Sequence, residues 1–365
     1  MKIKVNRKEL VKHINIVQKA ISNRTTMQIL EGILLIAEDN TLTLIASDET
    51  VSIKSKLSTI VNQPGKCVVN ARLFGEITRR LQDDIIDITV EQSNMNINAR
   101  RSDFNIQVQN ESGFPDLPRM DDEQNIEINA EIFKDAVRKT TFAVSLDETR
   151  KNFTGVFMDV VPGMTNFVAL DGFRMALKSI KNNTQISTSA IIPARALNEL
   201  VKIIDDEEKS IKIDLNMNQI RFTLESAELY STLISGEFFN YDGLIRKDHS
   251  TIVTANIAEI QNALERASLL AKEERANLVK LDIGNSDILI TSNSEIGSVK
   301  ENVESQVDGD ELKIAFNSRY LLEGIKNMKG ANLKLNFTDS VNPCIVKEED
   351  DPDYIYLVLP VRLAN

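Results

Sequence analysis

Three short segments of the sequence carry charged residues of the same kind in the same order. Each has an arginine, a glutamate four residues later and a second base three residues after the glutamate. Because positions i, i+4 and i+7 share one face of an α-helix, each segment predicts a helix that presents a net positive stripe. A stripe repeated three times indicates contact with something regular and anionic. The three sets are Arg72/Glu76/Arg79, Arg195/Glu199/Lys202 and Arg319/Glu323/Lys326.

Residue patterns that would support covalent chemistry are absent from the sequence. There is no G-x-G pair and no G-x-x-x-x-G-K-[ST] loop, which disfavours a nucleotide cofactor. The two histidines, His13 and His249, have no cysteine or Ser-x-Gly elbow beside them, and Cys67 and Cys344 form no metal or disulfide framework. We therefore expect no catalytic residue, no metal and no cofactor. A hydrolase on a repeated scaffold is the alternative from another class.

Other landmarks share the spacing of the charged sets. The three arginines lie 123 and 124 residues apart, and Asn6 and Asn129, each at the start of a helix-like stretch, lie 123 apart. The segments 45–48 (Ile-Ala-Ser-Asp) and 168–171 (Val-Ala-Leu-Asp) keep the same offset. Chance similarity between helix-plus-strand stretches is the alternative explanation. The period predicts three tandem domains, over residues 1–124, 125–246 and 247–365.

Each repeat is expected to contain two helices and a set of antiparallel strands, which makes the fold class α+β. In the first repeat, Asn6 is a candidate N-cap for a helix over 7–20, and the second helix covers 72–81 with Leu73, Phe74, Ile77 and Leu81 on its apolar side. The expected strands cover 32–37, 41–46, 51–57, 86–90, 94–99 and 105–109. Proline and acidic residues near 114–123, and the segment 238–249, predict linkers.

The overall charge and the composition limit the possible partners. The net charge is −11, yet residues 1–24 hold seven bases and a single acid, Glu9, so basic helices on a private surface fit an acidic exterior. Tryptophan is absent and aromatic residues make up 5% of the chain, which fits phosphate contact with a duplex better than base stacking on a single strand. No apolar run approaches the roughly 20 residues of a membrane span, and the charged start is unlike a secretory signal. A cytoplasmic protein is expected.

Three motifs resemble those of the bacterial sliding clamp family, the beta subunit of DNA polymerase III. Residues 22–30 (Ser-Asn-Arg-Thr-Thr-Met-Gln-Ile-Leu) resemble the family's R-x-T-L-P-I-L element, and 168–177 resemble its V-A-T-D-G-H-R-L-A segment. Residues 354–363 resemble its Y-x-x-M-P-M-R-L ending. The resemblance spans the whole chain and implies a head-to-tail dimeric ring around duplex DNA. It implies a processivity factor whose partners are the polymerase III catalytic subunit, the clamp loader and other clamp-motif proteins.

The resemblance and the repeats together predict the residues of each surface. Arg24 and Arg195 are expected to contact DNA by resemblance, and the repeat adds Arg72, Arg79, Lys202, Arg319, Lys326 and Lys12. The family's partner-peptide cleft implies a matching set of largely apolar residues. They are Phe153, Leu170, Gly172, Arg174, Met175, Phe239, Leu244, Val341, Pro343, Val358, Leu359, Pro360, Val361 and Arg362.

Some positions depart from the family's pattern. Phe173 replaces its histidine, Phe239 stands where proline is common, and Gln28 replaces the proline of the N-terminal element. A clamp-fold paralogue that binds partner peptides but is poorly loaded on DNA is therefore the alternative function. Helix 265–271 resembles the family's ring interface, where Leu269 and Leu270 would pack against the partner copy.

Overall fold

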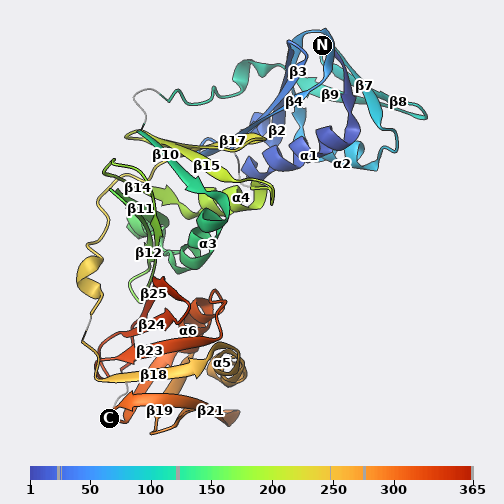
Figure 1. The fold of residues 1–365 in the computed structure, drawn as a ribbon. Coiled ribbons are helices and arrows are strands. Elements are labelled where there is room, and N and C mark those ends of the chain that lie inside the picture. The colour runs from blue at the N-terminus through green and yellow to red at the C-terminus, as the bar shows by residue number, and fades with distance from the viewer. Residues whose placement is uncertain (23–24, 26, 121–123, 247, 274–276, 363–365) are drawn as a thin grey trace. The chain divides into compact units, whose positions relative to one another are not determined.

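In the computed structural model, the chain divides into two units, each built around one sheet. Residues 1–22, 25, 27–120, 124–246, 248–273 and 277–362 are described. The first unit contains Met1–Glu131 and Arg195–Leu233, and the second contains Ile132–Ala194 and Ile234–Asn365. Figure 1 shows both units as ribbons.

The element order β-α-β-β-β-β-α-β-β-β occurs three times along the chain, with one additional strand, β5, in the first copy. The predicted fold class, three tandem repeats of a two-helix antiparallel domain, is thereby confirmed. The first copy has β1 (Lys2–Asn6), α1 (Arg7–Val17), β2 (Gly32–Glu38), β3 (Thr41–Ser47), β4 (Val51–Ser58), β5 (Ile60–Gln63), β6 (Gly65–Asn70), α2 (Ala71–Arg80), β7 (Ile85–Glu91), β8 (Asn94–Ala99) and β9 (Ser102–Gln109).

The second and third copies follow the same order. The second has β10 (Gln124–Asn129), α3 (Ala130–Thr140), β11 (Gly155–Val161), β12 (Met164–Leu170), β13 (Arg174–Lys181), β14 (Thr188–Pro193), α4 (Ala194–Ile203), β15 (Ser210–Leu215), β16 (Gln219–Thr223) and β17 (Ala227–Thr232). The third has β18 (Thr251–Asn256), α5 (Ile257–Ala271), β19 (Leu278–Ile283), β20 (Asp287–Ser294), β21 (Gly297–Gly309), β22 (Leu312–Asn317), α6 (Ser318–Ile325), β23 (Asn332–Phe337), β24 (Cys344–Glu348) and β25 (Asp351–Val358).

An asparagine immediately precedes α1, α2, α5 and α6, where its side chain accepts a backbone N–H that the first turn leaves unpaired. Asn6 caps α1 by accepting from Glu9 N, as the sequence predicted, and Asn70 accepts from Leu73 N at the start of α2. Asn256 and Asn317 cap α5 and α6 in the same way. Each of these asparagines is the last residue of a strand, so one residue ends the strand and starts the helix.

The sheet of the first unit has the order β10-β15-β16-β17-β4-β3-β2-β6-β9-β8-β7-β1-β5. The last strand of the second repeat, β17, pairs antiparallel with β4 and so extends the sheet of the first repeat. In this joint between the two repeats, Leu229 stands opposite Ile53. Helices α1 and α2 lie side by side in this unit (Figure 1). Leu10, Ile14 and Phe74, on the inner faces of these helices, are fully buried.

The sheet of the second unit repeats this construction. Its order is β14-β11-β12-β13-β25-β24-β23-β18-β21-β20-β19-β22, and β25 of the third repeat pairs antiparallel with β13 of the second. In that joint Met175 stands opposite Leu357. The β13–β25 joint therefore brings residues far apart in the sequence into one continuous surface.

The structure differs from the sequence-based expectation in a few elements. Helix α1 ends at Val17 and continues as a 3-10 turn over Gln18–Ala20, where the sequence predicted one helix. Strands β1, β5 and β6 were not predicted. Leu73 was expected on the buried side of its helix and is 45% exposed, because the stripe that faces the core centres on Phe74 and Ile77.

Candidate functional site

The predicted basic faces of the first unit lie on α1, α2 and the unit's part of α4. Arg72 Nε is 3.1 Å from Glu76 Oε1, and the arginine side chain is 88% exposed. Arg79 Nη1 donates to Asn15 Oδ1 of α1 at 2.9 Å. Helices α1 and α2 thus share a polar surface that includes two of the predicted bases.

The other predicted bases of this unit also have partners within it. Arg195 forms an ion pair with Asp48 and donates to the backbone oxygen of Ala20 at 3.1 Å. Lys202 Nζ lies 2.8 Å from Glu199 Oε1, and Lys12 Nζ lies 3.1 Å from Asp205 Oδ2. Arg24 lies outside the described residues. Arg195 and Glu199, four residues apart on α4, therefore pair with other residues rather than with each other.

The second unit presents the third copy of the stripe on α5 and α6. Arg319 Nε is 2.7 Å from Glu323 Oε1, and Lys326 Nζ is 2.9 Å from Glu265 Oε1 of α5. Burial by itself would raise the pKa of Glu323, but hydrogen bonds from Arg319 and Arg174 outweigh it and lower that pKa. The carboxylate is held in its charged form.

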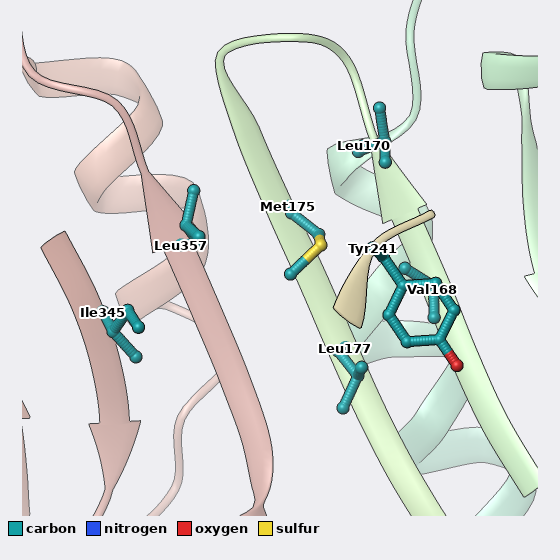
Figure 2. Close-up of a cluster of buried hydrophobic side chains, with 7 residues drawn as sticks. All are labelled: Val168, Leu170, Met175, Leu177, Tyr241, Ile345 and Leu357. Carbon is teal, nitrogen blue, oxygen red and sulfur yellow. The ribbon is translucent and has the colours of Figure 1, made fainter. Parts of the chain in front are cut away.

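A hydrophobic cluster lies at the β13–β25 joint (Figure 2). Leu170 at the end of β12 and Met175 at the start of β13 belong to it, together with Leu357 on β25. Two further residues of the predicted cleft, Phe153 and Leu244, pack against this cluster. The sequence prediction missed Val168, Leu177, Tyr241, Ile345 and Leu357, which complete the buried part of the cluster.

Aromatic packing explains part of what the sequence missed. Phe238 rather than its predicted neighbour Phe239 stacks on Phe157, with ring centroids 4.7 Å apart, and Phe239 is 48% exposed. Tyr241, in the segment predicted as a linker, is buried, and its hydroxyl donates to Asp159 Oδ2 at 2.8 Å. Strand alternation on β11 could have suggested Phe157, but nothing in the sequence distinguished Phe238 from Phe239.

The chain's last described segment closes one side of this cluster. Leu359 N donates to Phe173 O at 2.8 Å, and Val361 N donates to Ala315 O of β22 at 2.8 Å. Val358 is fully buried, whereas Val341 and Phe173 are largely exposed. The remaining predicted residues, Pro343, Pro360 and Arg362, are half-buried or exposed, and Gly172 has a positive φ of 93° in the turn before β13.

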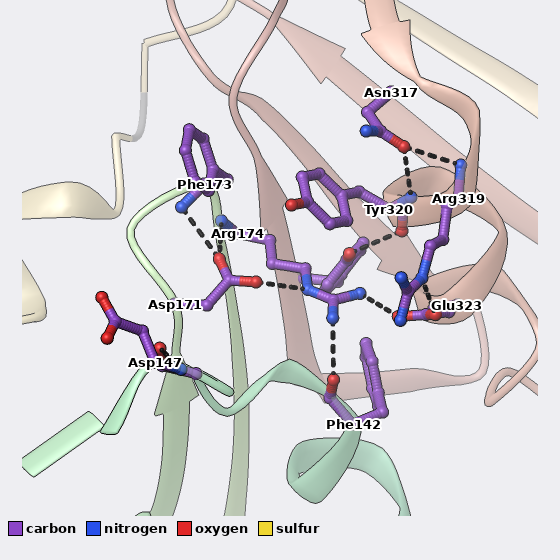
Figure 3. Close-up of polar contacts among 11 residues, drawn as sticks. Phe142, Asp147, Asp171, Phe173, Arg174, Asn317, Arg319, Tyr320 and Glu323 are labelled. Carbon is purple, nitrogen blue, oxygen red and sulfur yellow. Dashed lines mark hydrogen bonds and ion pairs between the residues drawn. The ribbon is translucent and has the colours of Figure 1, made fainter. Parts of the chain in front are cut away.

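Arg174 lies beside the cluster and is bonded on all sides (Figure 3). Its Nε donates to Asp171 Oδ2 at 3.0 Å, its Nη2 donates to Phe142 O at 2.9 Å, and its Nη1 pairs with Glu323. The guanidinium also lies 4.7 Å from the ring centroid of Tyr320, which stacks on Phe173. Burial by itself would lower the pKa of Arg174, but Tyr356, Glu323 and Asp171 outweigh burial and raise that pKa above its ordinary value. This arginine is fixed by the protein's own groups.

The predicted interface residues lie on the outward side of α5. Ile260 and Leu264 of that helix are buried, whereas Leu269 is 65% exposed. Leu270 is half-buried near Gly297, the first residue of β21. Leu269 thus projects away from the core of its own unit, as the sequence predicted.

Within the described ranges, no group of three or more histidine, cysteine or carboxylate side chains is arranged to hold a metal ion. Among the helices in that same part of the chain, none combines the length and the apolarity needed to cross a bilayer. The arrangement offers basic helix faces, a hydrophobic cluster with exposed apolar residues beside it, and an exposed apolar residue on α5, which are the features of a binding protein.

Comparisons with known proteins agree with this architecture. Three family patterns match in order, described as the DNA polymerase III beta subunit N-terminal domain (residues 1–118), central domain (127–240) and C-terminal domain (243–362). The beta sliding clamp of Bacillus subtilis is 34% identical over 376 residues, covering 99% of this chain and 100% of that protein. The beta sliding clamp of Staphylococcus aureus is 31% identical over 374 residues, covering 99% of each.

Solved structures show the same similarity. The Bacillus subtilis sliding clamp has a TM-score of 0.96 at 34% identity, with 100% of both chains covered. The beta subunit of Streptococcus pyogenes DNA polymerase has a TM-score of 0.96 at 27% identity, also with 100% of both chains covered. The fold and the basic helix faces therefore define a DNA clamp. The chain belongs to the DNA polymerase III beta subunit family, and it functions as the processivity clamp of that polymerase.

Proposed function

We propose that two copies of this chain close head to tail into a ring around duplex DNA, without catalytic activity of their own. The observation that supports this proposal is a pair of open strand edges. In the described residues, β17 pairs with β4 and β25 pairs with β13, so each repeat adds its last strand to the preceding repeat. In the first repeat, β9 is the last strand, as β17 and β25 are in the other two repeats. In the third repeat, β21 has the place that β4 and β13 have in the first two. Among the described strands, neither β9 nor β21 pairs with a strand of another repeat.

The ladders locate these open edges. Residues 102–107 of β9 pair only with β8, and residues 297–304 of β21 pair only with β20, among the strands described. Phe104 stands opposite the buried Ile97, so it points to the helix side of β9 and is 38% exposed. Leu269 is exposed on α5, which covers the helix side of β21. We infer that Phe104 of one copy packs near Leu269 and Leu270 of the other.

The β17–β4 joint inside the first unit also predicts a charge pair for the proposed joint between β9 of one copy and β21 of the other. Lys54 of β4 pairs with Glu228 of β17 at 3.1 Å. Lys300 lies as far from the centre of the β20–β21 hairpin as Lys54 lies from the centre of the β3–β4 hairpin. In the same way, Asp103 in the β8–β9 hairpin corresponds to Glu228 in the β16–β17 hairpin. We therefore expect Lys300 to pair with Asp103 of the second copy.

The DNA-facing set in this proposal is the set of basic helix faces. It consists of Arg24, Arg72, Arg79, Arg195, Lys202, Arg319, Lys326 and Lys12. Contacts from these bases to phosphate carry little sequence information and are weakened by salt, so a ring held by its topology can slide. We propose that this clamp acts on chromosomal DNA in the bacterial cytoplasm.

The cluster at the β13–β25 joint is the proposed partner cleft. Its buried floor and its exposed rim residues, Val341, Phe239 and Leu359, suit a short peptide that inserts two apolar side chains. The proposed partners are the polymerase III catalytic subunit, the clamp loader and other proteins that carry a clamp-binding peptide. A related sliding clamp from Pseudomonas aeruginosa, 26% identical with a TM-score of 0.95, was solved bound to griselimycin.

The alternative, a paralogue that is poorly loaded on DNA, is not favoured. Relatives of the same length are named as sliding clamps, and the basic faces are present in all three repeats. We expect wild-type clamp, with a cognate polymerase and loader, to lengthen the products made on a primed circular template. An intact ring that gave no such increase would support the paralogue instead.

Light scattering tests the ring directly. A solution mass of twice 41.0 kDa at low micromolar concentration is expected for the wild type. Lys300→Asp should shift the mass toward the monomer by placing two carboxylates together, and adding Asp103→Lys should restore the dimer. Lys313→Asp, on β22, is the matched control because Lys313 pairs only with Asp282 of its own unit among described residues. A wild-type monomer, or no effect of Lys300→Asp, would contradict the proposed joint.

A further inference from the structure

The bases of the proposed DNA-facing set are already paired within the protein. Of the seven that the structure describes, six have a carboxylate within ion-pair distance, and Arg79 is bonded to Asn15 and Gln18 instead. A phosphate must therefore compete with a carboxylate for almost every base on these faces. This competition is a property of the faces themselves, in addition to the net charge of −11.

Helix stability does not explain the placement of these charges. Arg72, Arg195 and Arg319 are each the second residue of their helix, where the helix dipole disfavours a base. The glutamates follow four residues later, although the order with glutamate first stabilises a helix better. An arrangement that stabilises the helix less than the reverse order would recurs in all three repeats, which indicates that it serves the surface.

We propose that the glutamates of these faces, chiefly Glu76 and Glu199, weaken the clamp's grip on DNA by competing with phosphate for the neighbouring bases. This inference rests on the proposed DNA-facing role of the bases. A ring needs only a loose contact, because its topology keeps it on the duplex, and tight phosphate contacts would hinder sliding. A solvent-accessible ion pair such as Arg72–Glu76 is worth about a two- to five-fold change in an equilibrium constant.

The three repeats implement this competition differently. Among the residues that the structure describes, Glu76 pairs with Arg72 at 3.1 Å, and Glu199 pairs with Lys202 at 2.8 Å. Glu323 is shared between the exposed Arg319 and the buried Arg174, so its removal would also disturb the cleft. Glu76 and Glu199 are therefore the residues at which the effect can be tested without touching the cleft.

The test uses the full-length clamp and a short fluorescein-labelled duplex, with anisotropy measured over a series of KCl concentrations. Glu76→Gln/Glu199→Gln should bind about four-fold or more tightly than wild type, with a steeper dependence of log K on log salt. Glu38→Gln/Glu91→Gln is the matched control, since it changes the net charge equally at exposed sites on β2 and β7. Glu76→Gln alone, at an exposed side chain, should show a two-fold effect and guards against misfolding of the double variant.

The outcomes separate this inference from the proposed function. Arg72→Gln/Arg319→Gln should weaken binding, and if it does not, the DNA-facing role of these bases is wrong. If those arginine variants weaken binding but Glu76→Gln/Glu199→Gln leaves it unchanged or weaker, the DNA face stands and the glutamates only orient the bases. An equal gain in the Glu38→Gln/Glu91→Gln control would assign the effect to net charge. Either of the last two results overturns the inference.

Discussion

Lys139 of α3 and Asp351 of β25 form an ion pair of 2.6 Å inside the second unit, where the second and third repeats meet. Lys139 also lies 2.8 Å from Glu348, and its side chain is 4% exposed. Lys178 of β13 pairs with the other oxygen of Asp351. Burial would raise the pKa of Asp351, but the two lysines outweigh it and lower that pKa. A buried charge network thus ties a helix of one repeat to the last hairpin of the next.

Lys139→Met is expected to destabilise the protein by about 3–5 kcal/mol, because it removes the buried ammonium that pairs with Glu348 and leaves Asp351 with Lys178 alone of its two described lysine partners. Urea unfolding monitored by circular dichroism measures this loss. Lys329→Met is the control, since Lys329 pairs with Asp135 at 2.9 Å but is largely exposed, and should cost at most about 1 kcal/mol. Equal losses in the two variants would show that burial of the network adds nothing.

The stability of the first unit should depend on the protonation of His13. His13 Nδ1 lies 2.6 Å from Ser55 Oγ, which donates its proton to Ser226 O, so the imidazole donates to the serine. Burial lowers the pKa of His13 below its ordinary value of 6.5. The unfolded chain then takes up a proton more readily than the folded chain. Stability is full above about pH 6.5 and falls as the pH drops toward the folded pKa, with a slope of at most about 1.4 kcal/mol per pH unit.

This pH dependence can be measured one histidine at a time. The pKa of His249 is also lowered, by burial first and by Lys347, so His249→Gln is used as the parent protein. Thermal denaturation between pH 5 and 7 should show a decline with acidity in His249→Gln that His13→Gln/His249→Gln largely lacks. If both proteins lose stability equally over this range, other groups are responsible.

Gly324→Ala should disrupt the packing of α6 on β25. A Cβ at this position would lie 2.1 Å from Cε1 of Tyr356, whose hydroxyl donates to Tyr320 O at 2.6 Å. Relief requires a shift of the helix or of the buried ring, and such overpacking costs about 1–3 kcal/mol or more. Gly243→Ala, where a Cβ meets nothing within 4 Å, is the neutral control. A melting temperature unchanged by Gly324→Ala would show that the helix moves without cost.

Substitutions at the exposed rim of the proposed cleft should weaken peptide binding without destabilising the protein. Val341→Glu and Phe239→Glu place a charge at exposed rim positions and should each weaken binding of a short peptide with two apolar anchor residues about ten-fold or more. Because both side chains are exposed, the free energy of unfolding should stay within about 1 kcal/mol of the wild-type value. Met217→Glu, at a position 95% exposed in the first unit, should leave peptide affinity unchanged. Titration calorimetry on all three variants provides the comparison.

The sequence alone determined the repeat, the fold class and the charged helix faces. These features depend on spacing along one helix or one strand: Arg72 and Glu76 share a face because of helical geometry. Asn6 could be identified as a cap because it immediately precedes the helix it caps.

The tertiary structure alone decided which residues meet across the repeats. Arg195 pairs with Asp48 of the first repeat rather than with Glu199, and Arg174 is held by Glu323 from the next repeat. These pairings join residues up to about 150 positions apart. They depend on the registers of β17 with β4 and of β25 with β13, which no local pattern specifies. Since a shift of one residue would turn every side chain of a strand to the opposite face, the composition of the cleft is a consequence of sheet register.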